Sequence, residues 1–428
     1  MRVLLLNLYF PPDTSATAKS ADAIVRALAQ THQVTVLCGR PSYDPAERRP
    51  WKLWQAERFE VQCASAQPDP GGNSAAAAAS FTVIRVGSTD YPRLRMKLRV
   101  LNYLTYTKLA ALRSLFIPCD AIFAMTDPPF NGITAAFLAA LKGKPLVYDI
   151  QDMYPDMAVA GSIVKPGLLA RFWERLHRWA LRRAARVIVL GEDMRARVVY
   201  KDPASKGIDA SKVFIVRSGV EPADSSAATP SANAALNPEV IRAIRANFRF
   251  VLLHAGNLGF YGAWDTIIAA ARQLEGHNIG VVFVGGGAER ARLESLAAGA
   301  ANIRFLDFFP ARAIPSVLAA PDAHIVTIKP GLEGVVVPSK MFGIMAAGKP
   351  ILAVAAATTD VATLGARHGF AICSDPANPA ELASAIRNMA ANSAQVAAMG
   401  QAAAHAATQY SRSGELAKLL SIVANLQP

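Results

Sequence analysis

The segment Lys329–Lys340 carries residue types that can bind a phosphorylated ligand. It reads KPGLEGVVVPSK, with a carboxylate at Glu333 and an ammonium group at each end. The apolar run Ala323–Thr327 comes just before it and predicts a buried strand. Pro338 and Ser339 can open the next helix, whose free backbone N–H groups and positive dipole end attract an anion. The pattern predicts a phosphate site that includes Lys329, Ser339 and Lys340, and an ordinary capped turn is the alternative.

Two glycine-containing turns follow predicted strands in the same half of the chain. HAGNLG spans 254–259 and VGGGAER begins at Val284. Gly256 and Gly259 allow the backbone to approach a diphosphate closely, and Asn257 supplies a neutral donor. Gly286 sits in the second turn, which can equally be a plain connection. We expect Gly256, Asn257, Gly259 and Gly286 to contact the same ligand as the lysine segment.

The first half of the chain offers a loop of small hydroxylated residues after its first predicted strand. The loop reads YFPPDTSAT and contains Thr14, Ser15 and Thr17. Small side chains let a ligand reach backbone N–H groups, as glycines do in phosphate loops. No GxGxxG fingerprint and no Walker lysine pattern is present, which argues against a dinucleotide or P-loop site.

Carboxylates gather after another predicted strand of the first half. Asp149, Asp152 and Asp156 lie in the stretch YDIQDMYPD. A carboxylate at a strand end that faces a cleft can act as a general base, whereas Asp is also a common helix cap. We favour Asp152 ahead of Asp149 for a catalytic role.

Size, composition and cysteine usage restrict the class of protein. A chain of 428 residues exceeds what one hydrophobic core usually serves, which predicts two domains. With 52% hydrophobic and 18% charged residues it is globular rather than disordered. Its four cysteines stand singly, so neither a metal site nor a disulfide framework is predicted, and a reducing cytoplasm fits best. The N-terminal apolar run is too short for a signal peptide, and no stretch has membrane-spanning length.

The net charge of +13 is concentrated in two stretches, Arg93–Arg113 and Arg171–Arg186. In the first, leucines alternate with Arg and Lys, and Tyr103 and Tyr106 are interleaved. This pattern suits a helix on an anionic membrane surface, and a core-facing helix with a solvated basic face remains the alternative. We expect no nucleic-acid binding, because no zinc-finger, RNP-type or helix-turn-helix pattern accompanies the charge.

Strand-like runs alternate with helical stretches along nearly the whole chain, which predicts an α/β fold with parallel sheets. The predicted strands are Val3–Asn7, Val34–Leu37, Phe81–Val86, Ala121–Met125, Leu146–Ile150, Val187–Leu190, Val213–Val216, Phe250–His254, Val281–Gly285, Ile303–Leu306, Ala323–Thr327, Ile351–Val354 and Ala371–Cys373.

We predict two doubly wound, Rossmann-like domains that face each other across a cleft, with ligands at the carboxyl ends of the strands. The proposed N-terminal domain spans residues 1–220 and contains a low-complexity loop at 67–80. A linker rich in Pro, Ser and Ala covers 221–238, and the C-terminal domain covers 239–405. The tail 406–428 is predicted to be a helix that packs back across the junction.

The ordered motifs of the chain resemble those of a known enzyme family. They are YFPPDTSATA, AMTDPPF, DIQDMYPD, IVRSGVEP, HAGNLG, VFVGGG and PGLEGVVVPSKMFGIMAAGKP. In order and spacing they resemble the GT-B glycosyltransferases of family 4, retaining enzymes that use sugar nucleotides in bacterial surface polysaccharide synthesis.

The resemblance implies a nucleotide-sugar donor held by the C-terminal domain and an acceptor held by the N-terminal domain, with no metal required. Glu333 falls near the first acid of the family's two-glutamate motif and would handle the donor sugar. Ser339, Lys340 and the backbone after Val337 would meet the diphosphate. Thr14, Ser15 and Thr17 would contact the acceptor.

The chain departs from the family pattern at two places. The position of the second glutamate, which usually binds the ribose, is Gly343 here. The arginine and lysine that usually follow the GxL turn are replaced by Asn257 and a neutral stretch through Gly262, which leaves Lys329 or Lys340 as substitutes.

The implied function is transfer of a sugar to a hydroxyl of a glycan or polyprenyl-linked acceptor, by a cytoplasmic enzyme that is peripheral on the inner face of the membrane. Two alternatives stay open. One is a sugar-nucleotide 2-epimerase or phosphorylase on the same two-domain plan. The other is a non-catalytic, two-lobed binding protein.

Overall fold

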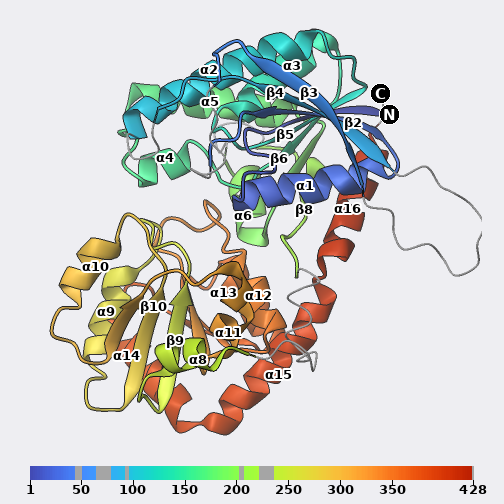
Figure 1. Ribbon diagram of the computed structural model, residues 1–428. Coiled ribbons are helices and arrows are strands. Elements are labelled where there is room, and N and C mark those ends of the chain that lie inside the picture. The colour runs from blue at the N-terminus through green and yellow to red at the C-terminus, as the bar shows by residue number, and fades with distance from the viewer. Residues whose placement is uncertain (44–50, 64–78, 92–95, 202–206, 221–235, 427–428) are drawn as a thin grey trace, which may run out of the picture. The chain divides into compact units, whose positions relative to one another are not determined.

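The computed structural model describes residues 1–43, 51–63, 79–91, 96–201, 207–220 and 236–426 of the chain (Figure 1). The chain divides into two compact units. Unit 1 comprises Met1–Leu190, Arg195–Val216 and Leu416–Pro428, and unit 2 comprises Gly191–Met194 and Arg217–Glu415. Of the predicted low-complexity loop and linker, 67–78 and 221–235 lie outside the described residues, as do Arg93 and Arg95 of the basic stretch.

Unit 1 contains an eight-stranded sheet in the order β3-β4-β2-β1-β5-β6-β7-β8. Its strands are β1 (Arg2–Leu6), β2 (Gln33–Gly39), β3 (Ala56–Gln62), β4 (Ser80–Val86), β5 (Ala121–Met125), β6 (Leu146–Asp149), β7 (Arg186–Val189) and β8 (Val213–Ile215). Its helices are α1 (Ala16–Ala29), α2 (Met96–Leu115), α3 (Asn131–Lys142), α4 (Asp156–Ala160), α5 (Leu168–Arg183), most of α6 (Glu192–Val199) and most of α16 (Arg412–Ala424).

All pairs in this sheet are parallel except that of β3 with β4. The sequence prediction missed β3, whose residues AERFEVQ carry three charges and leave nearly every side chain exposed. Charged residues on an edge strand discourage pairing with another chain, and they also hide the apolar alternation by which a strand is recognised.

Unit 2 contains a six-stranded, fully parallel sheet in the order β11-β10-β9-β12-β13-β14. Its strands are β9 (Phe250–Ala255), β10 (Ile279–Val284), β11 (Ile303–Leu306), β12 (Ala323–Thr327), β13 (Ile351–Val354) and β14 (Ala371–Ser374). Its helices are α8 (Pro238–Arg245), α9 (Trp264–Arg272), α10 (Arg290–Leu296), α11 (Ile314–Ala319), α12 (Lys340–Ala346), α13 (Asp360–His368), α14 (Pro379–Ala391) and α15 (Ser393–Gln409).

Successive residues of the central strands of unit 2 are buried alternately in two hydrophobic cores, one on each face of the sheet. This explains why these strands are apolar throughout. Leu252 of β9 packs with Trp264 of α9, whereas its neighbour Leu253 packs with Ile244 of α8 on the opposite face. Both faces of the sheet are therefore covered by helices (Figure 1). This confirms the predicted α/β class with parallel-strand sheets in two units.

Unit 1 is closed on one face by its own C-terminal segment. Leu419 and Ile422 of α16 are buried in the same core as Ile24 and Leu28 of α1. The predicted tail 406–428 contains the end of α15 and then α16, rather than one helix. Its residues up to Glu415 group with unit 2 and those from Leu416 with unit 1.

Three parallel helices, α2, α3 and α5, cover the other face of the unit 1 sheet. Gly132 of α3 lies directly on the buried ring of Tyr148 in β6, and a Cβ at position 132 would overlap that ring. The close approach lets Asn131 donate its amide N–H groups to the backbone oxygens of Leu6 and Met125, at 2.8 and 2.9 Å. α3 is therefore fixed at the carboxyl ends of β1 and β5.

Gly132→Ala is expected to destabilise the protein by about 1–3 kcal/mol, because the added methyl group over-packs the core at Tyr148. Gly167→Ala is the matched control, since residue 167 is extended and has open space around its Cβ position. We expect the control to stay within about 0.5 kcal/mol of wild type in urea denaturation. Equal midpoints for the two variants would contradict this account of the α3 contact.

Candidate functional site

In each unit, the predicted site residues lie at the carboxyl ends of the strands, around two adjacent central strands from which the chain winds in opposite directions. In unit 2 these strands are β9 and β12, and in unit 1 they are β1 and β5. Loops that leave such a pair diverge and leave the space between them uncovered, and ligands of open α/β sheets bind there.

The unit 2 cluster is built on two interlocked glycine turns. Gly256 has φ 133° and Gly285 has φ 137°. Residues that carry a Cβ rarely adopt such backbone angles, whereas glycine does so readily. A Cβ at Gly285 would overlap the carbonyl oxygen of Gly256. Leu258 donates its N–H to the Gly286 oxygen at 2.7 Å, which fixes the two turns to each other. Asn257 is left exposed at the rim of the turn.

Lys340, the first residue of α12, extends its amino group beneath the first glycine turn. Its Nζ donates to the Ala255 oxygen at 3.2 Å and lies 3.1 Å from Nε2 of His254. A Cβ at Gly256 would stand 3.2 Å from the same Nζ, so only glycine leaves the ammonium group uncovered on that side. Desolvation lowers the pKa of Lys340 to about 7.

His254 is a site residue that the sequence reasoning did not single out. It is buried at the end of β9 and its ring packs edge-on against Trp264, with centroids 4.7 Å apart. Burial, and then the nearby Lys340 charge, hold the pKa of His254 well below its usual range. The imidazole is therefore neutral and can accept a hydrogen bond from the ammonium group. A histidine inside an apolar strand just before a glycine turn was the available signal.

The loop between β12 and α12 is held in place by alternate buried residues. Leu332 and Val335 are buried, whereas Lys329 and Ser339 are exposed. Glu333 is half-buried, and its Oε1 accepts a hydrogen bond from the Gly331 N–H at 3.1 Å. Val337 and Pro338 are partly exposed and lead directly into α12.

Asp193 also supports this loop, although it is distant in sequence. Its carboxylate accepts a hydrogen bond from the Gly334 N–H at 3.3 Å, and a Cβ at Gly334 would press against the Asp193 backbone. Burial and the neighbouring Asp360 carboxylate raise the pKa of Asp193 to about 6. Asp360 itself is fully buried and pairs with Arg217 at 2.9 Å. A sequence pattern could not reveal this support, because the contact exists only through the tertiary fold.

The unit 1 cluster brings together residues from the loops after β1, β5 and β6. The Thr17 hydroxyl is hydrogen-bonded to the Asp127 carboxylate, which lies in the AMTDPPF motif. Asp152 follows β6, and its backbone N–H donates to the Thr126 hydroxyl at 3.3 Å. Burial and the nearby Asp127 charge raise the pKa of Asp152 to about 7. Asp127 was not among the predicted site residues.

A basic side chain of α2 reaches the same cluster. Arg99 donates to the Tyr9 hydroxyl at 2.8 Å and lies over the Tyr103 ring at 5.2 Å. Burial raises the pKa of Tyr103. The pKa of Asp127 is likewise raised, first by burial, while Thr17 and Arg99 oppose the shift.

The remaining predicted residues of unit 1 have different surroundings. The Ser15 hydroxyl caps α1 by accepting the Ala18 N–H at 3.1 Å, and Thr14 is exposed. The Asp149 carboxylate is buried and accepts a hydrogen bond from the Gln151 side chain at 2.8 Å. Asp152 is thus the more accessible carboxylate of the two proposed for catalysis.

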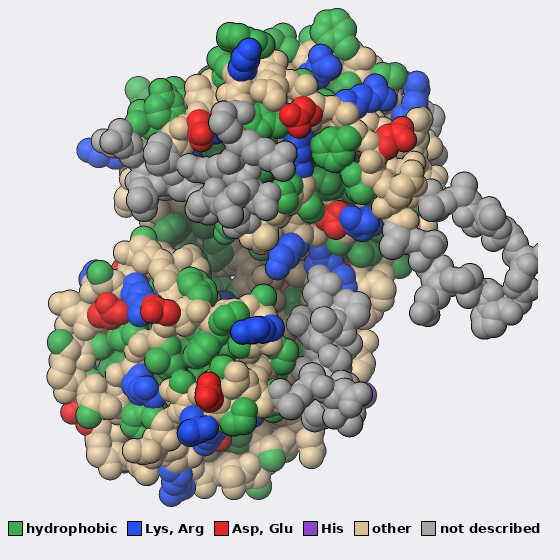
Figure 2. All heavy atoms as spheres, viewed as in Figure 1, with side chains coloured by type: hydrophobic (Ala, Val, Ile, Leu, Met, Phe, Trp, Pro, Cys, Tyr) green, Lys and Arg blue, Asp and Glu red, His purple; other side chains and the backbone are tan. Residues whose placement is uncertain are grey.

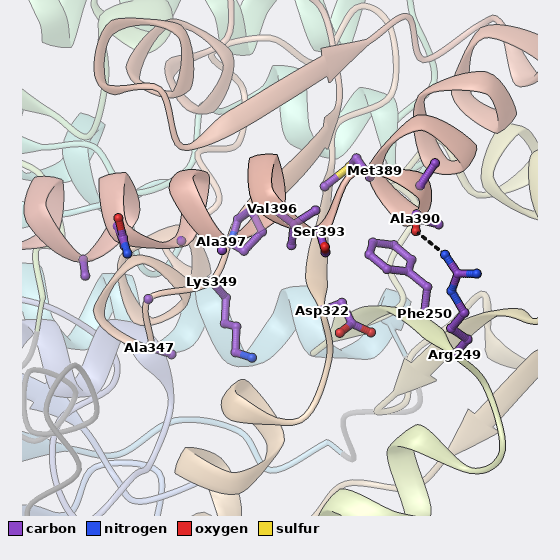
Figure 3. A pocket seen from close by; sticks show the side chains of 16 residues that line it. Arg249, Phe250, Asp322, Ala347, Lys349, Met389, Ala390, Ser393, Val396 and Ala397 are labelled. Atoms are coloured by element: carbon purple, nitrogen blue, oxygen red, sulfur yellow. Dashed lines mark hydrogen bonds between the residues drawn. The ribbon is translucent and has the colours of Figure 1, made fainter.

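A separate cavity of about 660 Å³ lies at the opposite, amino end of the unit 2 sheet. Figure 3 shows Arg249, Asp322 and Lys349 around it. Lys349 donates to the Pro321 oxygen at 2.9 Å, and Arg249 donates to the Ala390 oxygen at 3.1 Å. The cationic side chains are thus engaged by the protein itself, and we assign this cavity no role. Among the described residues, no group of three His, Cys, Asp or Glu is arranged to hold a metal.

Comparison with known proteins identifies the class. Residues 15–219 match the model of the "Glycosyl transferase 4-like domain", and residues 249–392 match that of the "Glycosyl transferases group 1". The chain is 24% identical over 396 residues to the putative colanic acid biosynthesis glycosyl transferase WcaI of Escherichia coli (strain K12), covering 90% of this chain and 91% of that protein. It is 27% identical over 279 residues to the probable glycosyltransferase WbjE of Pseudomonas aeruginosa, covering 62% and 64%.

Among solved structures, Anabaena HepE in complex with UDP superposes with a TM-score of 0.63 at 16% identity, covering 100% of both chains. Two α/β units, each with loop clusters at the carboxyl ends of its strands, correspond to the GT-B fold. This chain belongs to the GT-B glycosyltransferases, with its first part of the 4-like type and its second part of group 1.

The pH dependence of stability is expected to report the buried position of Lys340. Between pH 7 and its ordinary pKa of 10.5, the unfolded state holds a proton that the folded state has lost, so folding becomes more favourable as pH rises. Lys340→Met removes this contribution. The melting temperature of wild type relative to Lys340→Met should therefore increase steadily from pH 7 to 10.

Lys340→Arg serves as the control, because arginine stays charged over this range. Its melting temperature relative to Lys340→Met should show no such increase. If the melting temperatures of wild type and Lys340→Met changed by the same amount from pH 7 to 10, the claim that the Lys340 amine is desolvated would be contradicted.

Proposed function

We propose that this enzyme transfers a sugar, with retention of anomeric configuration, from a nucleoside-diphosphate sugar to a hydroxyl of a lipid-linked glycan acceptor in surface polysaccharide biosynthesis. The name of WcaI, which refers to colanic acid biosynthesis, supports the pathway class. The complexes of HepE with UDP and with UDP-glucose support a uridine nucleotide as the donor. A cytoplasmic location at the inner face of the membrane is part of the proposal.

The observation that carries the proposal is the Lys340 ammonium group beneath the glycine turn of Gly256. A departing diphosphate gains negative charge as the bond to the sugar breaks. Fixed cations and backbone N–H groups in a poorly solvated site stabilise such charge strongly. The turns at Gly256 and Gly286 present backbone to the ligand without side chains, and Ser339 adds an exposed hydroxyl.

On the donor side, we assign Glu333 to the sugar hydroxyls. Asn257 and Gly259 are assigned to the side of the diphosphate opposite Ser339 and Lys340. Lys329, exposed on the same loop as Glu333, supplies a second cation. The ribose contact is left without an acid, because Gly343 stands where the family resemblance places one.

The acceptor side is proposed to be the Thr17, Asp127 and Asp152 cluster of unit 1, with Thr14 and Ser15 contributing backbone groups. In the reaction the anomeric carbon loses its bond to the diphosphate oxygen and gains one to the acceptor oxygen. The acceptor proton passes to Asp152 or to the leaving phosphate. A carboxylate with a pKa of about 7 is suited to take a proton near neutral pH.

We propose that no metal ion is required, since Lys340 and the backbone donors neutralise the diphosphate. Chelation with EDTA should therefore leave transfer unchanged. The alternative functions give different products from the same substrates. An epimerase would change the donor sugar without an acceptor, and a binding protein would release no nucleotide.

The test is a panel of UDP-, GDP- and dTDP-sugars, read first as thermal stabilisation and then as nucleotide release with membrane acceptors. A matching donor at 100 times its dissociation constant stabilises the fold by about 2.7 kcal/mol. Lys340→Ala should lower kcat on the order of 10²–10³-fold while the protein remains folded. Lys19→Ala, an exposed lysine on α1, is the control. Transfer at the wild-type rate by Lys340→Ala would refute the assigned diphosphate site.

The Asp152→Asn variant tests whether the acceptor proton passes to Asp152 or to the leaving phosphate. If Asp152 is the base, kcat should fall about 10²–10⁴-fold. Because the bound diphosphate would keep Lys340 charged, wild-type kcat should then rise with pH through about 7 as the Asp152 carboxyl ionises. Asp149→Asn is the comparison, since its buried carboxylate contacts Gln151. An unchanged kcat in Asp152→Asn would assign the proton to the leaving phosphate instead.

A further inference from the structure

The basic charge of this protein is carried mainly by one helical layer. The helices α2, α3 and α5 contain ten Lys and Arg residues and one acidic residue, Glu174, a net +9 of the total +13. Such an imbalance on a single face is not needed for folding, and it creates a field that attracts anionic partners.

These helices are neighbours and lie side by side on one face of the unit 1 sheet (Figure 1). Lys142 of α3 donates to the backbone oxygens of Ser114 and Leu115 in α2, at 3.0 and 3.1 Å. Arg183 of α5 donates to the Ala139 oxygen of α3 at 3.2 Å. Because the sheet covers their inner side, the exposed side chains of all three helices point outward from the same layer.

The outward face also exposes large apolar side chains. They are Leu101, Leu104, Leu112, Leu115 and Phe116 at α2, Phe137 and Leu141 at α3, and Leu168, Leu169 and Phe172 at α5. Basic and hydrophobic side chains lie along this edge of unit 1 in Figure 2. A soluble monomer rarely leaves so many large apolar side chains uncovered on one face.

The densest part of the face is the start of α5 together with the turn before it. Leu168 is 83% exposed, Leu169 67% and Phe172 59%. Arg171 and Arg175 alternate with them and are exposed as well. We name Ile163–Arg175 the α5 tip.

We propose that the layer α2–α3–α5 is a docking surface for an anionic lipid bilayer, with the α5 tip inserting its apolar side chains among the headgroups. Charge complementarity commits the surface to lipid, because basic side chains rim apolar ones, as in helices that lie in the membrane interface. Within the described ranges, no helix is both long and apolar enough to cross a bilayer. The proposal extends the membrane location that is part of the proposed function, and it places the main contact on α5, beyond the basic stretch at Arg93–Arg113.

The experiment is flotation of the full-length protein with vesicles of phosphatidylcholine, with or without phosphatidylglycerol. Wild type should float with phosphatidylglycerol vesicles at low salt and be released by high salt. Arg171→Gln with Arg175→Gln should lower the partition coefficient about 25-fold, since each basic residue near the surface contributes roughly fivefold. Leu169→Ser with Phe172→Ser should lower it about tenfold or more, and salt should release the residual binding more readily.

Matched controls lie in unit 2. Arg242→Gln with Arg387→Gln removes the same charge from exposed positions on α8 and α14. Leu296→Ser with Ile314→Ser removes two side chains that are 40% and 42% exposed. Both controls should bind vesicles like wild type. Equal losses in controls and α5 variants, equal binding to pure phosphatidylcholine, or tighter binding to a DNA fragment than to vesicles at the same salt would each overturn the proposal.

Failure of this surface can be distinguished from failure of the proposed function. Vesicle binding is measured without a donor, and transfer can be measured with a detergent-dispersed acceptor. Under those conditions the α5 variants should keep wild-type kcat. A protein that transfers sugar and ignores anionic vesicles would refute the docking surface alone, and one that binds vesicles without transferring sugar would refute the transferase proposal alone.

Discussion

The position of the site depends on one topological constraint, the reversal of winding direction between neighbouring parallel strands. At β9 and β12, and again at β1 and β5, the connections leave toward opposite sides of the sheet. No helix can then cover the gap between the two loops, and backbone N–H groups remain available to a ligand. The polar groups that we assign to substrate lie on these loops or, in the case of Asp152, on the loop after the neighbouring strand β6.

Both loop clusters contain a titratable group whose charged form is disfavoured by burial. Lys340 and Asp152 each have a pKa near 7, displaced in opposite directions from their ordinary values. Such groups lower stability in the absence of ligand and gain favourable partners when substrate arrives, which fits a site organised for a charged donor. The neutral His254 beneath Lys340 positions the ammonium group without cancelling its charge.

Contacts with residues distant in sequence hold these loops in place. Asp193 holds the Gly334 turn, and the fully buried Asp360 is matched by Arg217 and by the Glu192 N–H at 3.0 Å. Removing one member of a buried pair leaves an uncompensated charge, so these residues are constrained by the fold itself. In unit 1, Asn131 plays the equivalent part by bonding the ends of β1 and β5.

The sequence by itself determined the α/β class, most strands and the glycine turns, because buried parallel strands are continuous apolar runs and glycine is favoured where φ is positive. It also singled out Lys340 and Asp152, which the structure places in the two loop clusters. It could not reveal β3, whose charged edge position hides the strand pattern, nor Asp127, Asp193 and His254, whose importance comes from contacts between distant segments. Likewise, the basic stretches were visible in the sequence, but only the tertiary structure brought α2, α3 and α5 into one layer. The crossover connections and the sheet beneath these helices decide which of their faces point outward.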